Sequence, residues 1–429
     1  MKRNANLILQ HILWRGLYFF SVLLINILIA RFFAAEKSGQ FFYIVNNLAF
    51  LILVVSLSLE SGTMFYISSG KADVITMARI NLLWAAVASL TALGIWILIT
   101  KQTTDKGLVF YAEICLYIFG ILLTTYFSSL FYALKRFAEP NKILFGINFL
   151  LVAILLIGKS SPDFRSNFLS IYLFCFFLQG LMVMLAFFYR TDSFNKEKIR
   201  GQSNLKNILR YSLTALTANI IYFLVNRVDY WFVKKYCSAE DLGNYIQASK
   251  LGQLMLIVPA ILGSTLFTIF SSEGKPGKIS HLMPVTRILL YFNLVICLLI
   301  IVLGRQLFPF VFGESFQKMY SLFLLLIPGI LALTINNPVT SWFSASDRVS
   351  VNVYGGLLAL VFIVMGDIFI LPRYGIWSAP LICSAGYMAY NLFCIYKLRS
   401  EKSVLVKDFI LLRKTDIKLL QQLLNESKS

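Results

Sequence analysis

Charged residues are scarce in this chain of 429 residues: Asp, Glu, Lys and Arg supply only 14% of it. A soluble globular domain carries about 25% charged residues, so this shortage excludes a water-soluble enzyme. Hydrophobic residues reach 58% of the chain and aromatic residues 15%, which also excludes a disordered or fibrous protein. Such a composition is typical of helices that face lipid. We therefore predict an all-α polytopic membrane protein.

Histidine and paired cysteine are lacking as well. The only histidines are His11 and His281, and the six cysteines stand singly, with no Cys-x-x-Cys pair. Neither a disulfide framework nor a metal site is indicated. The chain also lacks the Gly-x-x-x-x-Gly-Lys-Ser/Thr loop that binds ATP. We expect no metal, no cofactor and no enzymatic activity.

Long apolar stretches recur along the whole chain. A helix needs about 20 mostly apolar residues to cross a bilayer. The stretches that qualify as spans cover residues 11–33, 41–68, 80–99, 108–133, 143–158, 167–189, 208–232, 243–271, 286–304, 319–343, 351–371 and 376–396. We therefore predict about twelve transmembrane helices.

The basic residues predict the orientation of these spans. The formal charge is +19, but in so apolar a chain Lys and Arg are expected in cytoplasmic loops rather than on a nucleic acid. With the N-terminus inside, 25 basic residues fall in cytoplasmic segments and 11 in outside loops. This excess predicts that both termini are cytoplasmic.

A repeated motif suggests two halves. Residues 35–41 read Ala-Glu-Lys-Ser-Gly-Gln-Phe and residues 239–245 read Ala-Glu-Asp-Leu-Gly-Asn-Tyr, an offset of 204. The same offset carries Tyr18-Phe19 onto Tyr222-Phe223 and Gly70-Lys71 onto Gly274-Lys275, and a slightly longer one carries Ala133 and Arg136 onto Ala345 and Arg348. Six spans separate the copies, so the repeat is parallel. We predict two six-helix bundles, at 1–200 and 201–398, and a basic amphipathic cytoplasmic tail at 399–429.

Polar residues inside the spans mark the candidate site, because a charge at the bilayer centre usually faces a bundle interior or a wet cavity. Spans one and seven present matching polar faces, Arg227 and Asp229 lie beside the second, and spans eight and two add Lys250 and Glu60. Asp367 is interpreted as structural or interfacial. The candidate substrate-binding residues are Arg15, Tyr18, Asn26, Asn219, Tyr222, Asn226, Arg227 and Lys250, and the candidate coupling residues are Asp229 and Glu60.

The chemistry of these residues favours an anionic amphiphile. The embedded cations outnumber the clear anions in the helices expected to line the cleft. A desolvated Arg or Lys suits phosphate, and Arg can bind it with two hydrogen bonds. Tyr and Asn on the same faces suit sugar hydroxyls.

At this point the sequence resembles a family. The stretch from Leu28-Ile29-Ala30-Arg31 through Glu36-Lys37-Ser38-Gly39 to Tyr43, with Phe308-Pro309-Phe310-Val311-Phe312-Gly313, is similar to Wzx-type oligosaccharide flippases of the multidrug, oligosaccharidyl-lipid and polysaccharide exporter superfamily. The resemblance implies export of an undecaprenyl-diphosphate-linked oligosaccharide across the bacterial inner membrane, from the cytoplasmic to the periplasmic leaflet, for O-antigen or capsule assembly. It implies that Arg15, Arg227 and Lys250 receive the diphosphate, and that membrane lipid, a polysaccharide polymerase and a chain-length regulator are candidate partners.

Two alternatives of the same superfamily stay open. A multidrug cation exporter should place a carboxylate in the first helix, where this chain has Arg15. A lipid II flippase usually has fourteen spans, against the twelve predicted here.

Overall fold

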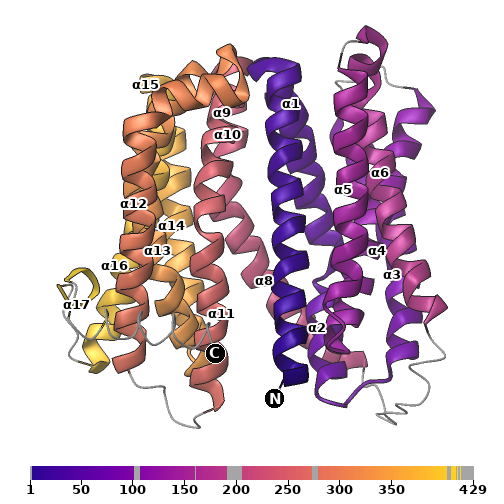
Figure 1. Cartoon of the computed structure of the whole chain (residues 1–429), viewed down its shortest axis with the longest axis horizontal. Coiled ribbons are helices and arrows are strands. Elements are labelled where there is room, and N and C mark those ends of the chain that lie inside the picture. Colours follow the sequence, from indigo (N-terminus) through magenta and orange to yellow (C-terminus); the bar gives the residue numbers. More distant parts are fainter. Residues whose placement is uncertain are drawn as a thin grey trace. The chain divides into compact units, whose positions relative to one another are not determined.

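The computed structural model describes residues 2–100, 107–159, 161–190, 205–272, 279–402, 407–411, 413 and 416. These residues form helices and short 3₁₀ turns, without a strand among them (Figure 1). The first helices are α1 (Lys2–Ser56), α2 (Leu59–Ser68), α3 (Val74–Thr100), α4 (Leu108–Ala133), α5 (Ala138–Gly158) and α6 (Pro162–Tyr189). The later ones are α8 (Leu205–Arg227), α9 (Asp229–Tyr236), α10 (Ala239–Met255), α11 (Ile257–Ser272), α12 (Ile279–Phe312), η1 (Glu314–Phe316), α13 (Gln317–Ala345), α14 (Val349–Phe369), α15 (Leu371–Tyr374), η2 (Gly375–Trp377), α16 (Ser378–Lys402) and α17 (Lys407–Ile410). The all-helical prediction is confirmed.

Eleven helical segments of the described chain are long and apolar enough to cross a membrane. The first of them, Leu13–Ser56, contains all of the first predicted span beyond residue 12 and most of the second. The two merge because α1 continues through a bend at Ala34, where φ is 57° and ψ is 174°. About twelve spans is therefore compatible with the structure.

The chain divides into two compact units. Unit 1 comprises Met1–Phe33 and Tyr43–Ile220, and unit 2 comprises Ala34–Phe42 and Ile221–Ser429. The division cuts α1 twice and α8 once. Nine residues of α1, Ala34–Phe42, therefore belong to the second unit.

In unit 1, α4 and α6 pack side by side at very close range (Figure 1). A Cβ added to Gly180 would lie 2.0 Å from the carbonyl oxygen of Gly120. Small residues let helix backbones approach in this way, which strengthens packing where no hydrophobic effect drives association. Phe127, Phe131 and Phe187 fill the space beside the contact with edge-to-face ring pairs.

The ends of α4 and α13 are built alike, as the second, longer repeat offset suggests. Lys135 after α4 and Asp347 after α13 have φ of 59° and 58°. The next amide in each case, that of Arg136 or Arg348, donates to the carbonyl five residues earlier at 2.9 Å. This is the left-handed closure that satisfies the last carbonyls of a helix. The helices α4 and α13, which correspond in the repeat, therefore end in the same backbone conformation.

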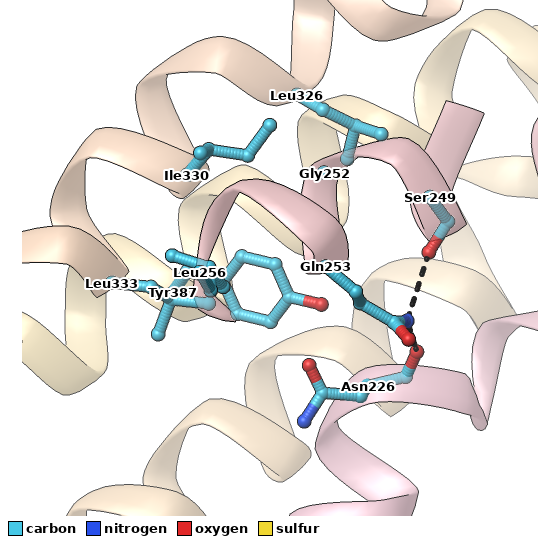
Figure 2. A pocket seen from close by; sticks show the side chains of 9 residues that line it. All are labelled: Asn226, Ser249, Gly252, Gln253, Leu256, Leu326, Ile330, Leu333 and Tyr387. Atoms are coloured by element: carbon cyan, nitrogen blue, oxygen red, sulfur yellow. Dashed lines mark hydrogen bonds between the residues drawn. The ribbon is translucent and has the colours of Figure 1, made fainter. Parts of the chain in front are cut away.

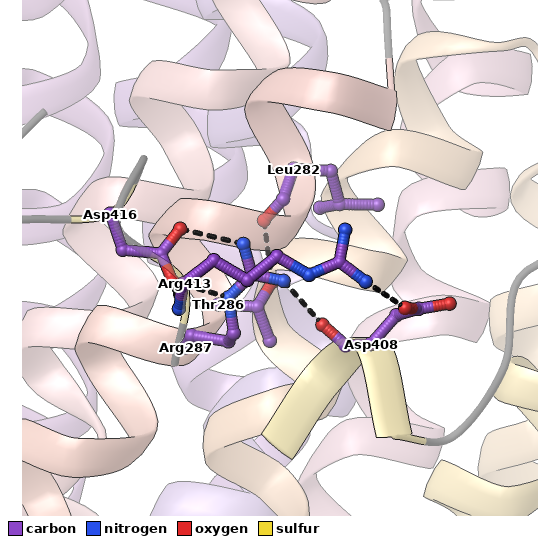
Figure 3. Close-up of polar contacts among 6 residues, drawn as sticks. All are labelled: Leu282, Thr286, Arg287, Asp408, Arg413 and Asp416. Carbon is purple, nitrogen blue, oxygen red and sulfur yellow. Dashed lines mark hydrogen bonds and ion pairs between the residues drawn. The ribbon is translucent and has the colours of Figure 1, made fainter. Parts of the chain in front are cut away.

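In unit 2, the C-terminal segment is held against α12 by a buried arginine (Figure 3). Arg287 donates from Nε and Nη2 to both oxygens of Asp416, at 2.7 and 2.6 Å, and from Nη1 to the carbonyl of Asp408 at 2.6 Å. The side chains of Arg287 and Asp416 are 2% and 0% exposed. Phe409 is fully buried in the hydrophobic core of this unit, and Arg413 pairs with the Asp408 carboxylate nearer the surface. A short helix, α17, is thereby anchored to the bundle.

Several expectations lie outside the described residues. They concern the basic loop at 191–204, the repeat positions Gly274 and Lys275, the side chains of His11 and His281, and most of the tail from 403 onward, whose amphipathic character remains a prediction.

Candidate functional site

Arg15 and Tyr18 lie on the first half of α1, within unit 1. The Arg15 side chain is exposed, and its Cζ lies 5.8 Å from the centre of the Phe19 ring, in cation–π range. Arg15 is also close enough to Tyr18 and Tyr132 to interact with them electrostatically. Among the described residues, the neighbours of the predicted cation are thus aromatic side chains.

The two asparagines predicted on the polar faces of unit 1 are bonded within the protein. Asn26 donates to the carbonyl of Val22 in its own helix at 2.7 Å. Asn219 donates to the hydroxyl of Ser58 at 3.1 Å, which ties α8 to the break between α1 and α2. The nearby Glu60 is half-buried, and its Oε2 has no hydrogen-bond partner among the described residues.

In unit 2, the structure brings Arg227 and Lys250 into one neighbourhood, close enough for mutual repulsion. Arg227 ends α8 with its Cζ 5.2 Å from the centre of the Phe223 ring. Lys250, on α10, has its Nζ only 3.1 Å from the centre of the Phe42 ring. Of the other predicted residues here, Tyr222 is 72% exposed and accepts a bond from Asn226 at its carbonyl.

A small pocket of unit 2 has Ser249, the residue directly before Lys250, in its lining (Figure 2). Gln253 projects into it and donates to Ser249 and to the backbone oxygen of Asn226, both at 3.4 Å. The Tyr387 hydroxyl points in from α16 toward Gln253, and leucine and isoleucine side chains line the pocket beside the tyrosine ring. About 270 Å³ of space lies among its lining residues, with the open solvent at its mouth included. Of the predicted residues only Asn226 lines it. Gln253 carried a signal that sequence reasoning missed, since it follows Lys250 at helical spacing.

Two carboxylates lie together deep in the same unit. Asp229, 1% exposed, accepts at Oδ2 from the Tyr245 hydroxyl and from Cys383 Sγ, the latter at 3.3 Å. Asp367 on α14 is fully buried and within electrostatic reach of Asp229. The Asp229 Oδ1 and both Asp367 oxygens lack a hydrogen-bond partner among the described residues. Asp367 is therefore a second candidate coupling residue beside Asp229. The position of Asp367 in the sequence did not indicate this role.

Comparisons with known proteins agree with this architecture. Residues 168–321 match a family model described as polysaccharide biosynthesis protein. No curated protein sequence matches the chain significantly.

Solved structures show the fold. A lipid II flippase, MurJ, in an inward closed conformation superposes with a TM-score of 0.70 at 15% identity, over 93% of this chain and 89% of that one. The Vibrio cholerae MATE transporter VcmN in its bent form gives 0.65 at 13% identity, over 96% and 100%. A MOP superfamily transporter from Pyrococcus furiosus, described as having a binding pocket of reverse polarity, gives 0.64 at 12% identity, over 92% and 94%. The chain has the fold of these MOP superfamily transporters.

Proposed function

We propose that this protein is a flippase that moves a polyprenyl-diphosphate-linked oligosaccharide from the cytoplasmic to the periplasmic leaflet by alternating access, for surface polysaccharide assembly. The observation that carries the proposal is the pair of embedded cations, Arg227 and Lys250, beside a pocket of amide and hydroxyl groups in unit 2. The match to a polysaccharide biosynthesis family and the fold shared with a lipid II flippase support it.

The chemistry divides the ligand between two kinds of side chain. Arg15, Arg227 and Lys250 receive the diphosphate, because charge-assisted hydrogen bonds are the strongest available to phosphate. The amides of Asn226 and Gln253 and the hydroxyls of Tyr222 and Tyr387 bind sugar. Asn26 and Asn219 are proposed to bind substrate in unit 1, where Asn26 donates to the carbonyl of Val22 and Asn219 to the hydroxyl of Ser58.

The first experiment tests the cations. Loss of one charged hydrogen-bond partner costs about 1.5–3 kcal/mol, so Arg227→Ala and Lys250→Ala should each lower glycan export roughly tenfold or more per molecule. Export is measured as surface glycan against membrane protein level in a strain that lacks the gene. Lys234→Ala, which removes an exposed cation of the same unit, is the matched control. Export at the control level by both variants contradicts the proposal.

We further propose that Asp229 and Asp367 bind the coupling ion, a proton or a monovalent cation. Two carboxylates buried together cannot both be ionised cheaply unless a cation shares the site, and three of their four oxygens lack a hydrogen-bond partner in the part of the chain that the structure describes. In proteoliposomes, Asp229→Asn and Asp367→Asn should remove the response of transport to pH and sodium gradients. Asp163→Asn, at the exposed start of α6, should keep it. Transport that ignores both gradients in the unaltered protein defeats this part of the proposal.

Two other functions of the same superfamily are tested with the same strains. A lipid II flippase is favoured by the TM-score of 0.70 with MurJ, and it should restore growth to cells depleted of their own lipid II flippase. A multidrug cation exporter is favoured by the MATE structures, and its loss should sensitise cells to cationic drugs while surface glycan stays normal.

A further inference from the structure

The segment Ala34–Phe42 is joined to unit 2 although its neighbours on both sides belong to unit 1. It begins at Ala34, whose φ of 57° and ψ of 174° lie in a region that only glycine adopts readily. An alanine is held there only when surrounding contacts fix it. Strained residues of this kind concentrate where a structure switches between two arrangements.

The contacts that fix the segment are unusually close. A Cβ on Gly39 would lie 2.7 Å from the Cα of Gly243, and a Cβ on Gly243 would lie 1.9 Å from the Ala35 oxygen. The two copies of the repeated motif therefore pack directly on each other, with no room for a side chain. Ser315 ties both: its hydroxyl accepts from the Ala35 amide at 2.9 Å, and its carbonyl from Asn244 at 3.0 Å.

The last residue of the segment contacts a cation of the proposed site. Phe42 is 5% exposed, and its ring face carries the Lys250 ammonium at 3.1 Å. A ring face is electrostatically negative, so it attracts an ammonium and repels an anion. A phosphate that approaches Lys250 from this side meets the ring and must displace it.

We propose that Ala34–Phe42 is a latch, and that a diphosphate bound to Lys250 opens it by displacing Phe42; this rests on the proposed function. A ligand can shift a conformational equilibrium only by binding one state better than the other. Lys250 supplies that difference, because the closed state places a negative ring face against the ammonium and the open state frees it. Opening also releases the strain at Ala34. Binding of the substrate is thereby linked to the part of α1 that belongs to unit 2.

The test measures how often the latch opens. Ser38 is fully buried on the segment, so Ser38→Cys reports opening by its rate of reaction with a maleimide. The test uses the full-length protein, in which the two half-buried cysteines are also replaced, by Cys115→Ser and Cys237→Ser, so that they do not react. Inorganic pyrophosphate should raise the rate about fivefold or more, the lower end of typical coupling. Lys250→Met should make the rate insensitive to it.

Two variants open the latch without ligand. Phe42→Leu removes the ring face and Gly243→Ala forces the helices apart, so both should raise the labelling rate. Gly146→Ala is the control, because a Cβ there meets nothing within 4 Å. If both variants label at the control rate, the latch is refuted whatever pyrophosphate does.

The outcomes separate the latch from the proposed function. Pyrophosphate that binds in a Lys250-dependent way by calorimetry, yet leaves labelling unchanged, overturns the latch and spares the function. Absence of Lys250-dependent binding overturns both. Vesicles that contain undecaprenyl diphosphate, compared with free pyrophosphate, show which source opens the latch at the lower concentration, and the proposed function requires the lipid.

Discussion

Replacing Arg287 should destabilise unit 2 more than almost any other single change of a charged residue. Its guanidinium makes three hydrogen bonds of 2.6–2.7 Å, two of them to an Asp416 that is 0% exposed. Removing one partner of a buried pair leaves the other charge without compensation, which costs about 3–5 kcal/mol. Arg287→Ala and Asp416→Ala should each lower the free energy of unfolding by that amount.

The neighbouring pair supplies an internal comparison. Arg413 and Asp408 also form an ion pair, but their side chains are 57% and 20% exposed. Exposed pairs contribute about 0–1 kcal/mol, so Arg413→Ala should have little effect. The double variant Arg287→Met, Asp416→Leu should recover much of the lost stability, because apolar residues of similar volume often replace a buried pair without loss.

The assay is the fraction of protein that remains monodisperse after heating in detergent, followed by fluorescence-detected size exclusion. Arg287→Ala should lose its folded fraction at a clearly lower temperature than Arg413→Ala. If the two variants melt together, or if the double variant is as unstable as the single ones, the buried pair does not anchor the C-terminal segment as argued.

Three further predictions concern other parts of the chain. Arg15→Ala should abolish glycan export while the protein accumulates normally, and Arg15→Lys should restore part of the export because the charge survives without the planar guanidinium. The measurement is surface glycan per amount of membrane protein. Normal export by a well-expressed Arg15→Ala protein removes Arg15 from the site. A reporter active only in the periplasm, fused after Ser429, should be silent, and a strong signal would reverse the predicted orientation. Gly180→Ala should sharply lower the yield of folded protein, since its Cβ would lie 2.0 Å from Gly120 oxygen; Gly94→Ala, with nothing within 4 Å, should be neutral.

The sequence predicted the fold well because each span carries its own signal. Apolar runs of membrane length and a repeated motif are local patterns, and both survive in the structure. The bend at Ala34 was not predictable, because the residue after it, Ala35, packs against Gly243, 208 residues further along the chain. A local pattern holds no information about such a partner.

The candidate site shows the same limit. Lys250 was identified as an embedded cation, but the Phe42 ring that covers it comes from another helix. Asp367 was interpreted as structural, and only packing of α14 against α9 reveals that it lies near Asp229. Asn219 was placed on a binding face by helical periodicity, which cannot tell a ligand-facing amide from one bonded to Ser58.

The division of the chain also constrains how the protein is made. Gly39 emerges from the ribosome 204 residues before Gly243, its packing partner. At a synthesis rate of about 5–20 residues per second, the segment around Gly39 waits roughly 10–40 s without its packing partner. The first half of the chain therefore cannot complete its native packing until the second half has been synthesised. Neither half should be obtainable as a native-like fragment when expressed alone.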